Sequence, residues 1–199
     1  KRWLCQSCEL DCHEGGRDCQ ELKWLEVFPY AINQVLEQEK AGYRMIDDKL
    51  VSITDENEIN SICDATQTQF LSVNIHMKKA MALYASREKP DYENSIKESI
   101  SAVEAICCII TGLSGGSATL GKTIKKLKEN GVVIHAAMEQ AFDKLYGYTS
   151  DSGGLRHGSI DFTNAPAEDA KYMLVSCSAF INYLLEKYNQ IGGNLYGQT

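Results

Sequence analysis

The chain has 199 residues, of which 44% are hydrophobic and 24% are charged, enough for one hydrophobic core with a small appended lobe. No apolar run reaches the ~18 residues of a membrane-spanning helix, and no signal peptide follows Lys1. The net charge of −7 argues against tight, non-specific binding of nucleic acid but is compatible with a small basic site at a subunit seam. The first residue is not methionine, which suggests a part of a longer protein with a further N-terminal domain.

The eight cysteines divide into an N-terminal cluster and four scattered positions. The cluster, Cys5-x-x-Cys8-x-x-x-Cys12-His13 with Cys19, has enough ligands for a tetrahedral zinc site but lacks the second two-ligand knuckle of common zinc folds. Its spacing also suits cysteines buried on one face of a helix, which is the interpretation we favour. The other four lie in apolar helical patterns, as is usual for reduced thiols of a cytoplasmic protein: Cys63, Cys107, Cys108 and Cys177.

Residues 1–90 are predicted to form an N-terminal helical extension that contains one β-hairpin. Apolar residues at helical spacing predict one or two helices over 19–43, with Pro29 as a kink or a boundary. Short alternating segments about an Asp-Asp turn predict a hairpin at about 43–53, and a capping-box pattern after it opens a short helix. The inward stripe expected of the first helix is Leu22, Leu25, Phe28, Ile32, Val35 and Leu36.

Two longer helices are predicted next. The first covers 68–86, and we interpret its His76 as an ordinary satisfied histidine rather than a ligand. The second covers 91–111, ends at a glycine and should be the most buried helix of the fold. Beside its apolar stripe, Glu98 is expected to extend outward to solvent, whereas Glu104 either does the same or serves as partner for a cation.

Gly116–Thr123 satisfies the G-x-x-x-x-G-K-[ST] pattern of a phosphate-binding loop letter for letter. Such a loop follows a buried strand, but the preceding residues have helical periodicity, and no alternating strand–helix pattern exists to build a parallel sheet. We therefore interpret the segment as a loop in which Thr119 caps a basic helix, Leu120–Glu129, ended by Gly131. A nucleotide-dependent enzyme is the more distant alternative.

Two further helices complete an all-α bundle. One is predicted over 132–146, and the last over 167–188 has an apolar face wide enough for the core and a partner surface. A disordered tail, 191–199, is expected to end the chain. The inward residues expected of the first of these helices are Ile134, Ala137, Met138, Ala141, Phe142 and Leu145.

The polar, glycine-rich segment 145–160 between these two helices is the strongest candidate for chemistry. It places Arg156 beside His157, where no hydrophobic stripe requires either residue. A guanidinium group binds phosphate oxygens through paired hydrogen bonds, and an imidazole can transfer a proton near neutral pH. The alternative is an arginine that interacts with a helix C-terminus beside a solvated histidine.

Four blocks of sequence, in order along the chain, carry a family resemblance. They resemble the C-terminal domain of bacterial abortive-infection proteins of the AbiJ type, which belongs to the HEPN superfamily. The resemblance covers about 91–187 well and the hairpin region before it more loosely. The blocks are Asp91-Tyr-Glu-Asn-Ser-Ile-Lys-Glu-Ser-Ile-Ser-Ala-Val-Glu-Ala-Ile, Ala118-Thr-Leu-Gly-Lys, Ala141-Phe-x-Lys-Leu-Tyr-Gly-Tyr-Thr-Ser-Asp-x-Gly-Gly-Leu-Arg-His, and Asp169-Ala-Lys-Tyr-Met-Leu-Val-Ser-Cys-Ser-Ala-Phe-Ile-Asn-Tyr-Leu.

The resemblance implies an all-α HEPN-type helical domain over 91–190 that dimerises. Many members of the family are metal-independent endoribonucleases in phage defence, so RNA is the implied partner and no cofactor or metal is expected. Their signature is an arginine followed, after four to six residues, by a histidine near the dimer seam. The arginine steadies the phosphate and the histidine transfers a proton, so that the RNA 2′-hydroxyl attacks the adjacent phosphorus.

The chain departs from that signature, because positions 150–152, where the arginine should precede His157, hold Ser-Asp-Ser. The nearest arginine is Arg156, which can serve the same site only if the loop or a second subunit brings the two groups together. The catalytic candidates carried over from the family are His157, Arg156 and Glu104, with Glu104 orienting His157. The substrate-binding candidates are Tyr148, Ser150 and Asp151.

Two functions follow from this reading. In the first, the protein is the ribonuclease effector of an abortive-infection system and works as a cytoplasmic homodimer. In the second, it is a non-catalytic HEPN module that dimerises or binds a partner, such as a further domain or another component of the defence system. The unexplained Arg156–His157 pair favours the first, whereas the missing spaced arginine and the acidic charge favour the second. Neither function involves a membrane.

Overall fold

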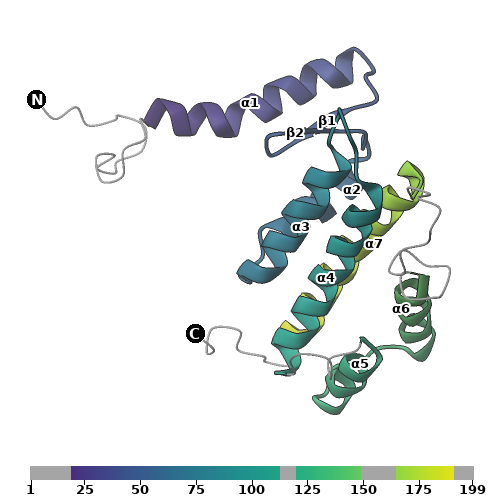
Figure 1. Cartoon of the computed structure of the whole chain (residues 1–199). Coiled ribbons are helices and arrows are strands. Elements are labelled where there is room, and N and C mark those ends of the chain that lie inside the picture. The colour runs from purple at the N-terminus through teal and green to yellow at the C-terminus, as the bar shows by residue number, and fades with distance from the viewer. Residues whose placement is uncertain (1–18, 113–119, 149–164, 191–199) are drawn as a thin grey trace, which may run out of the picture. The chain divides into compact units, whose positions relative to one another are not determined.

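The computed structural model describes residues 19–112, 120–148 and 165–190 (Figure 1). Within these ranges it contains seven helices and one two-stranded antiparallel sheet, which confirms the all-α class with a small hairpin extension. The chain divides into two compact units, 1–54 and 55–199, while the predicted domain boundary near residue 90 stays a prediction. None of the described helices is long and apolar enough to cross a membrane.

Helix α1 (Cys19–Gln38) begins the first unit and continues through Pro29, so this segment is one helix and not two. The inward stripe predicted for it is wrong at Phe28 and Val35, whereas Ile32 and Leu36 are half-buried. Phe28 and Val35 expose 49% and 56% of their surface. The side chains of residues 19–27 lie outside the description.

The predicted hairpin is confirmed. Strands β1 (Arg44–Ile46) and β2 (Lys49–Val51) pair antiparallel about the Asp-Asp turn. Asp47 has a φ of 50°, in the left-handed region that aspartate tolerates in such turns. Ile46 and Val51, at opposite ends of the hairpin but on the same face, are buried, so this face of the hairpin contributes to a core.

The side chain of Asn33 joins α1 to the outer edge of β1. The backbone N–H of Met45 donates to Asn33 Oδ1 at 2.6 Å, and Asn33 Nδ2 donates to the Met45 carbonyl at 2.9 Å. One amide side chain thus satisfies both backbone groups that an edge strand leaves unpaired. The helix and the hairpin are therefore held together by hydrogen bonds as well as by packing.

We predict that Asn33→Ala lowers the stability of the first unit by about 1–3 kcal/mol, because Met45 loses both partners. Hydrogen exchange of the Met45 amide should then become roughly tenfold faster or more. The control is Gln34→Ala, which removes only an exposed hydrogen bond to the Tyr30 hydroxyl and should leave this exchange unchanged. Unchanged exchange in Asn33→Ala would contradict the assignment.

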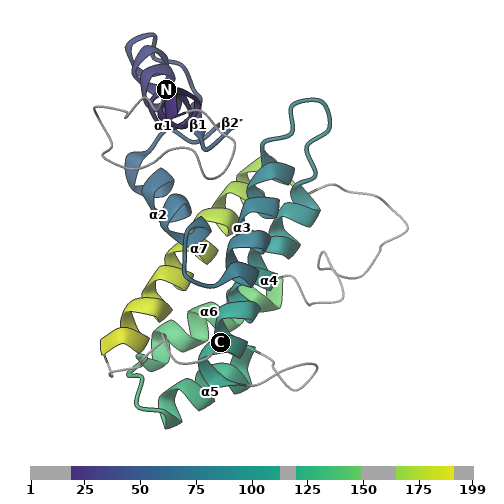
Figure 2. The same cartoon turned by 90° about the vertical axis from the view of Figure 1, so that its left-hand side faces the viewer.

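Three long helices lie side by side in the second unit (Figures 1 and 2): α3 (Leu71–Tyr84), α4 (Tyr92–Thr111) and α7 (Ala167–Gln190). Helix α2 (Glu56–Thr66) packs against α3 and α7. The core between them consists mainly of aliphatic side chains and methionines, as the sequence periodicity predicts. Its fully buried members include Ile62, Val73, Met77, Ile96, Ile106, Met173, Leu174, Ile181 and Leu184.

Small residues bring α3 and α4 close together. Ala80 and Ser95 are both fully buried where the two helices meet, and Ser95 Oγ donates to the Ala80 carbonyl at 2.8 Å. Ser99, one turn later and also fully buried, donates to the Ser95 carbonyl at 2.9 Å. Each buried hydroxyl therefore has an acceptor, and neither side chain has the bulk to separate the helices.

The predicted helix boundaries are largely confirmed. Asp55 caps α2 by accepting from the backbone N–H of the second and third residues of that helix, and Asp91 caps α4 in a similar way. Glu58, the other half of the predicted capping box, places Oε2 2.8 Å from Lys171 Nζ and so links α2 to α7. Gly112 ends α4 with a φ of 67°, the left-handed conformation expected of a C-terminal glycine.

Helix α5 (Leu120–Glu129) confirms the predicted basic helix and packs against the end of α4. Helix α6 (Ala136–Tyr148) starts four residues later than the predicted 132–146. Residues 132–135 alternate instead between buried and exposed: Val132 and Ile134 are buried, whereas Val133 and His135 are exposed. This period of two is that of an extended segment, and the apolar residues fit either periodicity when read alone.

We predict that Gly112→Ala destabilises the second unit by about 1 kcal/mol. Nothing lies within 4 Å of the added methyl group, so the cost is that of a left-handed backbone carrying a side chain. Gly147→Ala is the matched substitution: it also meets open space, but inside a helix, and should be neutral or slightly stabilising. Urea denaturation measures both, and equal effects would contradict this explanation.

Candidate functional site

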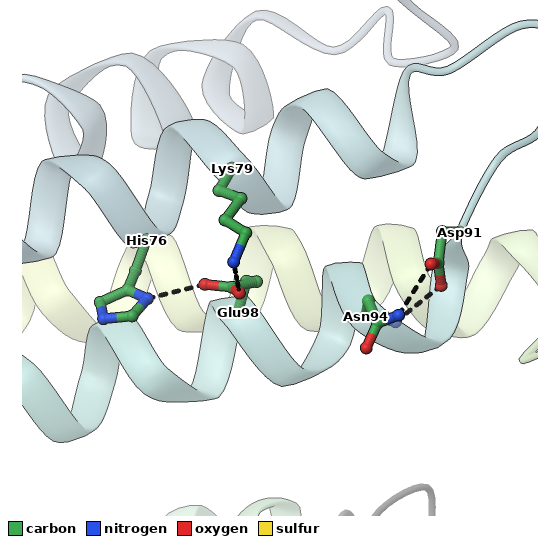
Figure 3. A network of polar contacts seen from close by, with 5 residues as sticks. All are labelled: His76, Lys79, Asp91, Asn94 and Glu98. Carbon is green, nitrogen blue, oxygen red and sulfur yellow. Dashed lines mark hydrogen bonds and ion pairs between the residues drawn. The ribbon is translucent and has the colours of Figure 1, made fainter.

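A carboxylate, an imidazole and an ammonium group meet on α3 and α4 (Figure 3). His76 Nδ1 lies 2.7 Å from Glu98 Oε2, and Lys79 Nζ contacts the other oxygen, Oε1. His76 and Lys79 are three residues apart, so both lie on the face of α3 that is turned to Glu98. Because an ionised carboxylate only accepts hydrogen bonds, His76 donates from Nδ1, and its Nε2 points away from Glu98 (Figure 3).

Glu98 is the least exposed member of this cluster. Its side chain exposes 16% of its surface, compared with 37% for His76 and 60% for Lys79. Burial raises the pKa of the Glu98 carboxyl, but the hydrogen bonds from Lys79 and His76 outweigh burial and hold the pKa below its usual range. Glu98 is therefore ionised at neutral pH, and the prediction that it extends outward to solvent is wrong.

The cluster can orient an imidazole, since a carboxylate on Nδ1 fixes both the ring and its tautomer. The prediction that His76 is a satisfied histidine is confirmed, although its partner comes from another helix. The available sequence signal was the three-residue spacing of His76 and Lys79. It gave no indication that Glu98, 22 residues after His76, would lie opposite them.

The catalytic pair predicted from the sequence is not described, and only Glu104 can be placed with its side chain. Glu104 lies near the middle of α4 and is half-buried. Glu104 is not isolated, because it interacts with another group. The following lie outside the described residues: Arg156, His157, Ser150, Asp151 and the side chain of Tyr148, the last residue of α6.

Glu104 carries its negative charge next to the vicinal thiols of Cys107 and Cys108. Burial raises the pKa of both thiols, and the carboxylate of Glu104 raises both further. Burial alone raises the pKa of Cys177, on α7, to about 12. These cysteines are free and stay protonated near neutral pH, so they behave as packing residues and not as nucleophiles.

An apolar hollow of about 720 Å³ lies between α6 and α7, the two helices that the predicted catalytic segment connects. Phe142 of α6 stacks on Phe180 of α7 with ring centroids 3.5 Å apart. Around this contact, Met138 and Tyr172 expose 39% and 62% of their surface. The inward face predicted for α6 is therefore wrong in part, since Ala137, Met138 and Ala141 are exposed.

The phosphate-loop pattern lies at a helix–helix connection. Helix α4 precedes it and α5 contains its last four residues, so the described element directly before the loop is a helix and not a strand. This supports the loop-and-helix interpretation, while Thr119 lies outside the described residues.

No group of three His, Cys, Asp or Glu side chains in the described ranges could hold a metal ion. The possible zinc ligands Cys5, Cys8, Cys12 and the Cys19 side chain lie outside those ranges.

We predict that Glu98→Gln lowers the free energy of unfolding by about 1 kcal/mol at pH 7, because the neutral amide no longer pairs with His76 and Lys79. The folded pKa of Glu98 is lowered. Its contribution is therefore present above about pH 5 and is lost as the pH falls below about 4. Urea denaturation should show wild type and variant converging at about pH 3.

The control for this prediction is Glu93→Gln, which removes an ion pair with Lys97 within α4. Such a pair between residues four apart contributes only about 0.3–0.5 kcal/mol. A wild-type advantage over Glu98→Gln that persists unchanged at about pH 3 would show that packing, and not charge, is responsible.

Comparison with known proteins concerns the N-terminal third of the chain. Residues 15–68 match the family model of AbiJ N-terminal domain 4, a segment that includes α1, the hairpin and α2. This match supports an abortive-infection protein that resembles AbiJ. The matched model describes an N-terminal domain and not a HEPN domain, so the HEPN resemblance of 91–187 stays a prediction. No curated protein and no solved structure matches the chain significantly.

Proposed function

We propose that this protein acts in phage defence as an abortive-infection effector that cuts RNA without a metal ion. The match of residues 15–68 to an AbiJ N-terminal domain supports the defence role, and the RNA-cutting activity is inferred from the family resemblance of 91–187. That match was found in a part of the chain separate from 91–187, where the resemblance to the HEPN domain of the same proteins lies. Two independent segments thus point to one class of defence protein.

The proposed chemistry is an in-line attack of the RNA 2′-hydroxyl on the adjacent phosphorus. A bond forms between the 2′-oxygen and phosphorus, and the bond from phosphorus to the 5′-oxygen breaks, leaving a 2′,3′-cyclic phosphate and a 5′-hydroxyl. His157 accepts the proton of the 2′-hydroxyl and returns one to the 5′-oxygen. Arg156 stabilises the negative charge on the phosphate, with Tyr148, Ser150 and Asp151 contacting the substrate.

The site is proposed to form at the seam of a homodimer. Arg156 and His157 are neighbours in sequence, so their side chains reach one phosphate most readily when the two groups come from different copies. Glu104 is proposed to orient His157, and its half-buried carboxylate on α4 is compatible with that role. The described helices α6 and α7 flank the catalytic segment in sequence.

A second candidate is a non-catalytic HEPN module that dimerises or binds a partner. The apolar hollow between α6 and α7 favours this alternative, because exposed Met138 and Tyr172 offer surface that a partner could bury. The serines and aspartate at 150–152, where the family has an arginine, favour it as well. Cleavage activity separates the two candidates.

We predict that the purified protein cuts RNA in excess chelator, and that His157→Ala lowers the cleavage rate at least 100-fold. Arg156→Ala should cause a similar loss, because charge stabilisation contributes about 3 kcal/mol or more. The products should end in 2′,3′-cyclic phosphate, and DNA of the same sequence should remain intact. Gel analysis of end-labelled RNA, beside end-labelled DNA of the same sequence, measures the cleavage rates, and mass spectrometry of the products identifies the cyclic phosphate.

His135→Ala serves as the control, since His135 is exposed and its ring accepts a hydrogen bond near the start of α6. It should cut RNA like wild type. Equal, background-level cutting by wild type and His157→Ala would leave only the binding role. Loss of cutting in His76→Ala, with His157→Ala fully active, would assign the chemistry to the cluster on α3 and α4.

A further inference from the structure

Helix α5 concentrates positive charge in an acidic protein. Its ten residues include four lysines and one glutamate, a net charge of +3. Without these five, the 20 basic and 27 acidic residues of the chain fall to 16 and 26, a net charge of −10. Although the chain has a net charge of −7, α5 is positively charged. The electrostatic potential near α5 therefore differs from that of the chain as a whole.

The two faces of α5 are sharply different. Ile124 and Leu127 are completely buried and Thr123 nearly so, where the helix packs against α4. The lysines occupy the opposite side, three of them exposed and Lys126 half-buried. We call this surface the lysine face; it consists of Lys122, Lys125, Lys126 and Lys128.

Two of these ammonium groups have no ion pair within the described part of the chain. Lys128 contacts Glu139 of α6, and Lys122 also interacts with another group. For Lys125 and Lys126, adjacent in the middle of the helix, the described residues supply no carboxylate within ion-pair distance. Their charges are thus the ones that a ligand on this face would meet first.

We propose that the lysine face binds the phosphate backbone of RNA. This inference rests on the proposed function, which makes RNA the substrate class. Ammonium groups act as point charges on phosphate oxygens, and such contacts position a strand without reading its sequence. A footprint of two to four lysines gives weak binding that depends on salt concentration, which suits a substrate that must be held and released.

Burial on α5 favours RNA over a membrane surface as the partner. A helix that binds lipid headgroups with basic residues also inserts an apolar face into the bilayer. The apolar face of α5 is not available for a membrane, because Ile124 and Leu127 are completely buried against the bundle. The exposed side of α5 therefore offers mainly the positive charges of its lysines. A polyanion is the ligand that such charges can bind without an apolar contact.

The test uses the full chain and a short, fluorescently labelled 2′-O-methyl oligoribonucleotide. This probe lacks the attacking hydroxyl, so its binding does not depend on cleavage. Fluorescence anisotropy should show that Lys125→Gln/Lys126→Gln weakens binding about tenfold or more at about 50 mM salt. The slope of log K against log salt concentration should become shallower by about 1.4, the value expected for two lost phosphate contacts on a single strand.

The matched control is Lys78→Gln/Lys89→Gln, which removes the same charge from two exposed lysines outside α5. It should bind like wild type, and thermal melting should show all variants folded. If both double variants lost binding equally, the effect would be one of net charge and not of α5, and the proposal would be overturned. Unchanged binding in Lys125→Gln/Lys126→Gln would also overturn it, as would binding of wild type to anionic phosphatidylserine vesicles but not to the oligoribonucleotide.

Failure of this proposal can be told apart from failure of the proposed nuclease. If RNA is never cut but binding still depends on Lys125 and Lys126, the lysine face stands and only the catalytic role of His157 fails. If RNA cleavage depends on His157 but RNA binding does not depend on Lys125 and Lys126, the proposed nuclease stands and the proposed role of the lysine face is wrong.

Discussion

The close contact between α3 and α4 is the constraint on which the larger unit depends. Ala80 and Ser95 meet there with no exposed surface, and the Ser95 hydroxyl is satisfied by the Ala80 carbonyl. A larger side chain at either position would separate the helices and leave a buried carbonyl without its partner. The same contact brings His76 and Lys79 over Glu98, so the polar cluster follows from the packing of small residues beneath it.

Helix α4 supports two of the described helices that follow it in sequence, α5 and α7. It packs against α3 and α7 along its length and receives α5 at its C-terminal end. Glu104 and the vicinal cysteines lie on this central helix, where burial keeps the thiols protonated. The predicted catalytic segment joins α6 to α7 in sequence, and of these two helices α7 packs directly against α4.

The distribution of charge along the chain bears on both the proposed nuclease and the proposed RNA-binding lysine face. A strongly acidic protein repels RNA at long range, so the proposed nuclease would need a local region of opposite sign. Helix α5 supplies a region of positive charge within the described part of the chain; in sequence it follows the polar cluster of α3 and α4 and precedes the predicted catalytic pair. The apolar hollow between α6 and α7 is a different kind of surface, and it suits protein contacts more than RNA.

Local interactions were predictable from the sequence because each is decided within a few residues. The caps at Asp55 and Asp91, the left-handed glycine at position 112 and the turn at Asp47 all depend on neighbours in the chain. The basic helix after the phosphate-loop pattern was identified by the periodicity around it. The catalytic candidates rest on a family resemblance, and of their side chains the structure describes only Glu104.

Features that depend on residues distant in sequence were decided only by the tertiary structure. Glu98 turned inward because packing of α3 on α4 supplied two cations, which no pattern around position 98 reveals. The apolar residues of α6 stayed partly exposed, and 132–135 became extended, because the neighbouring helices determine which faces are covered. A sequence specifies hydrophobic periodicity and helix ends directly, but burial and ion pairing between helices are properties of pairs of surfaces that meet only after folding.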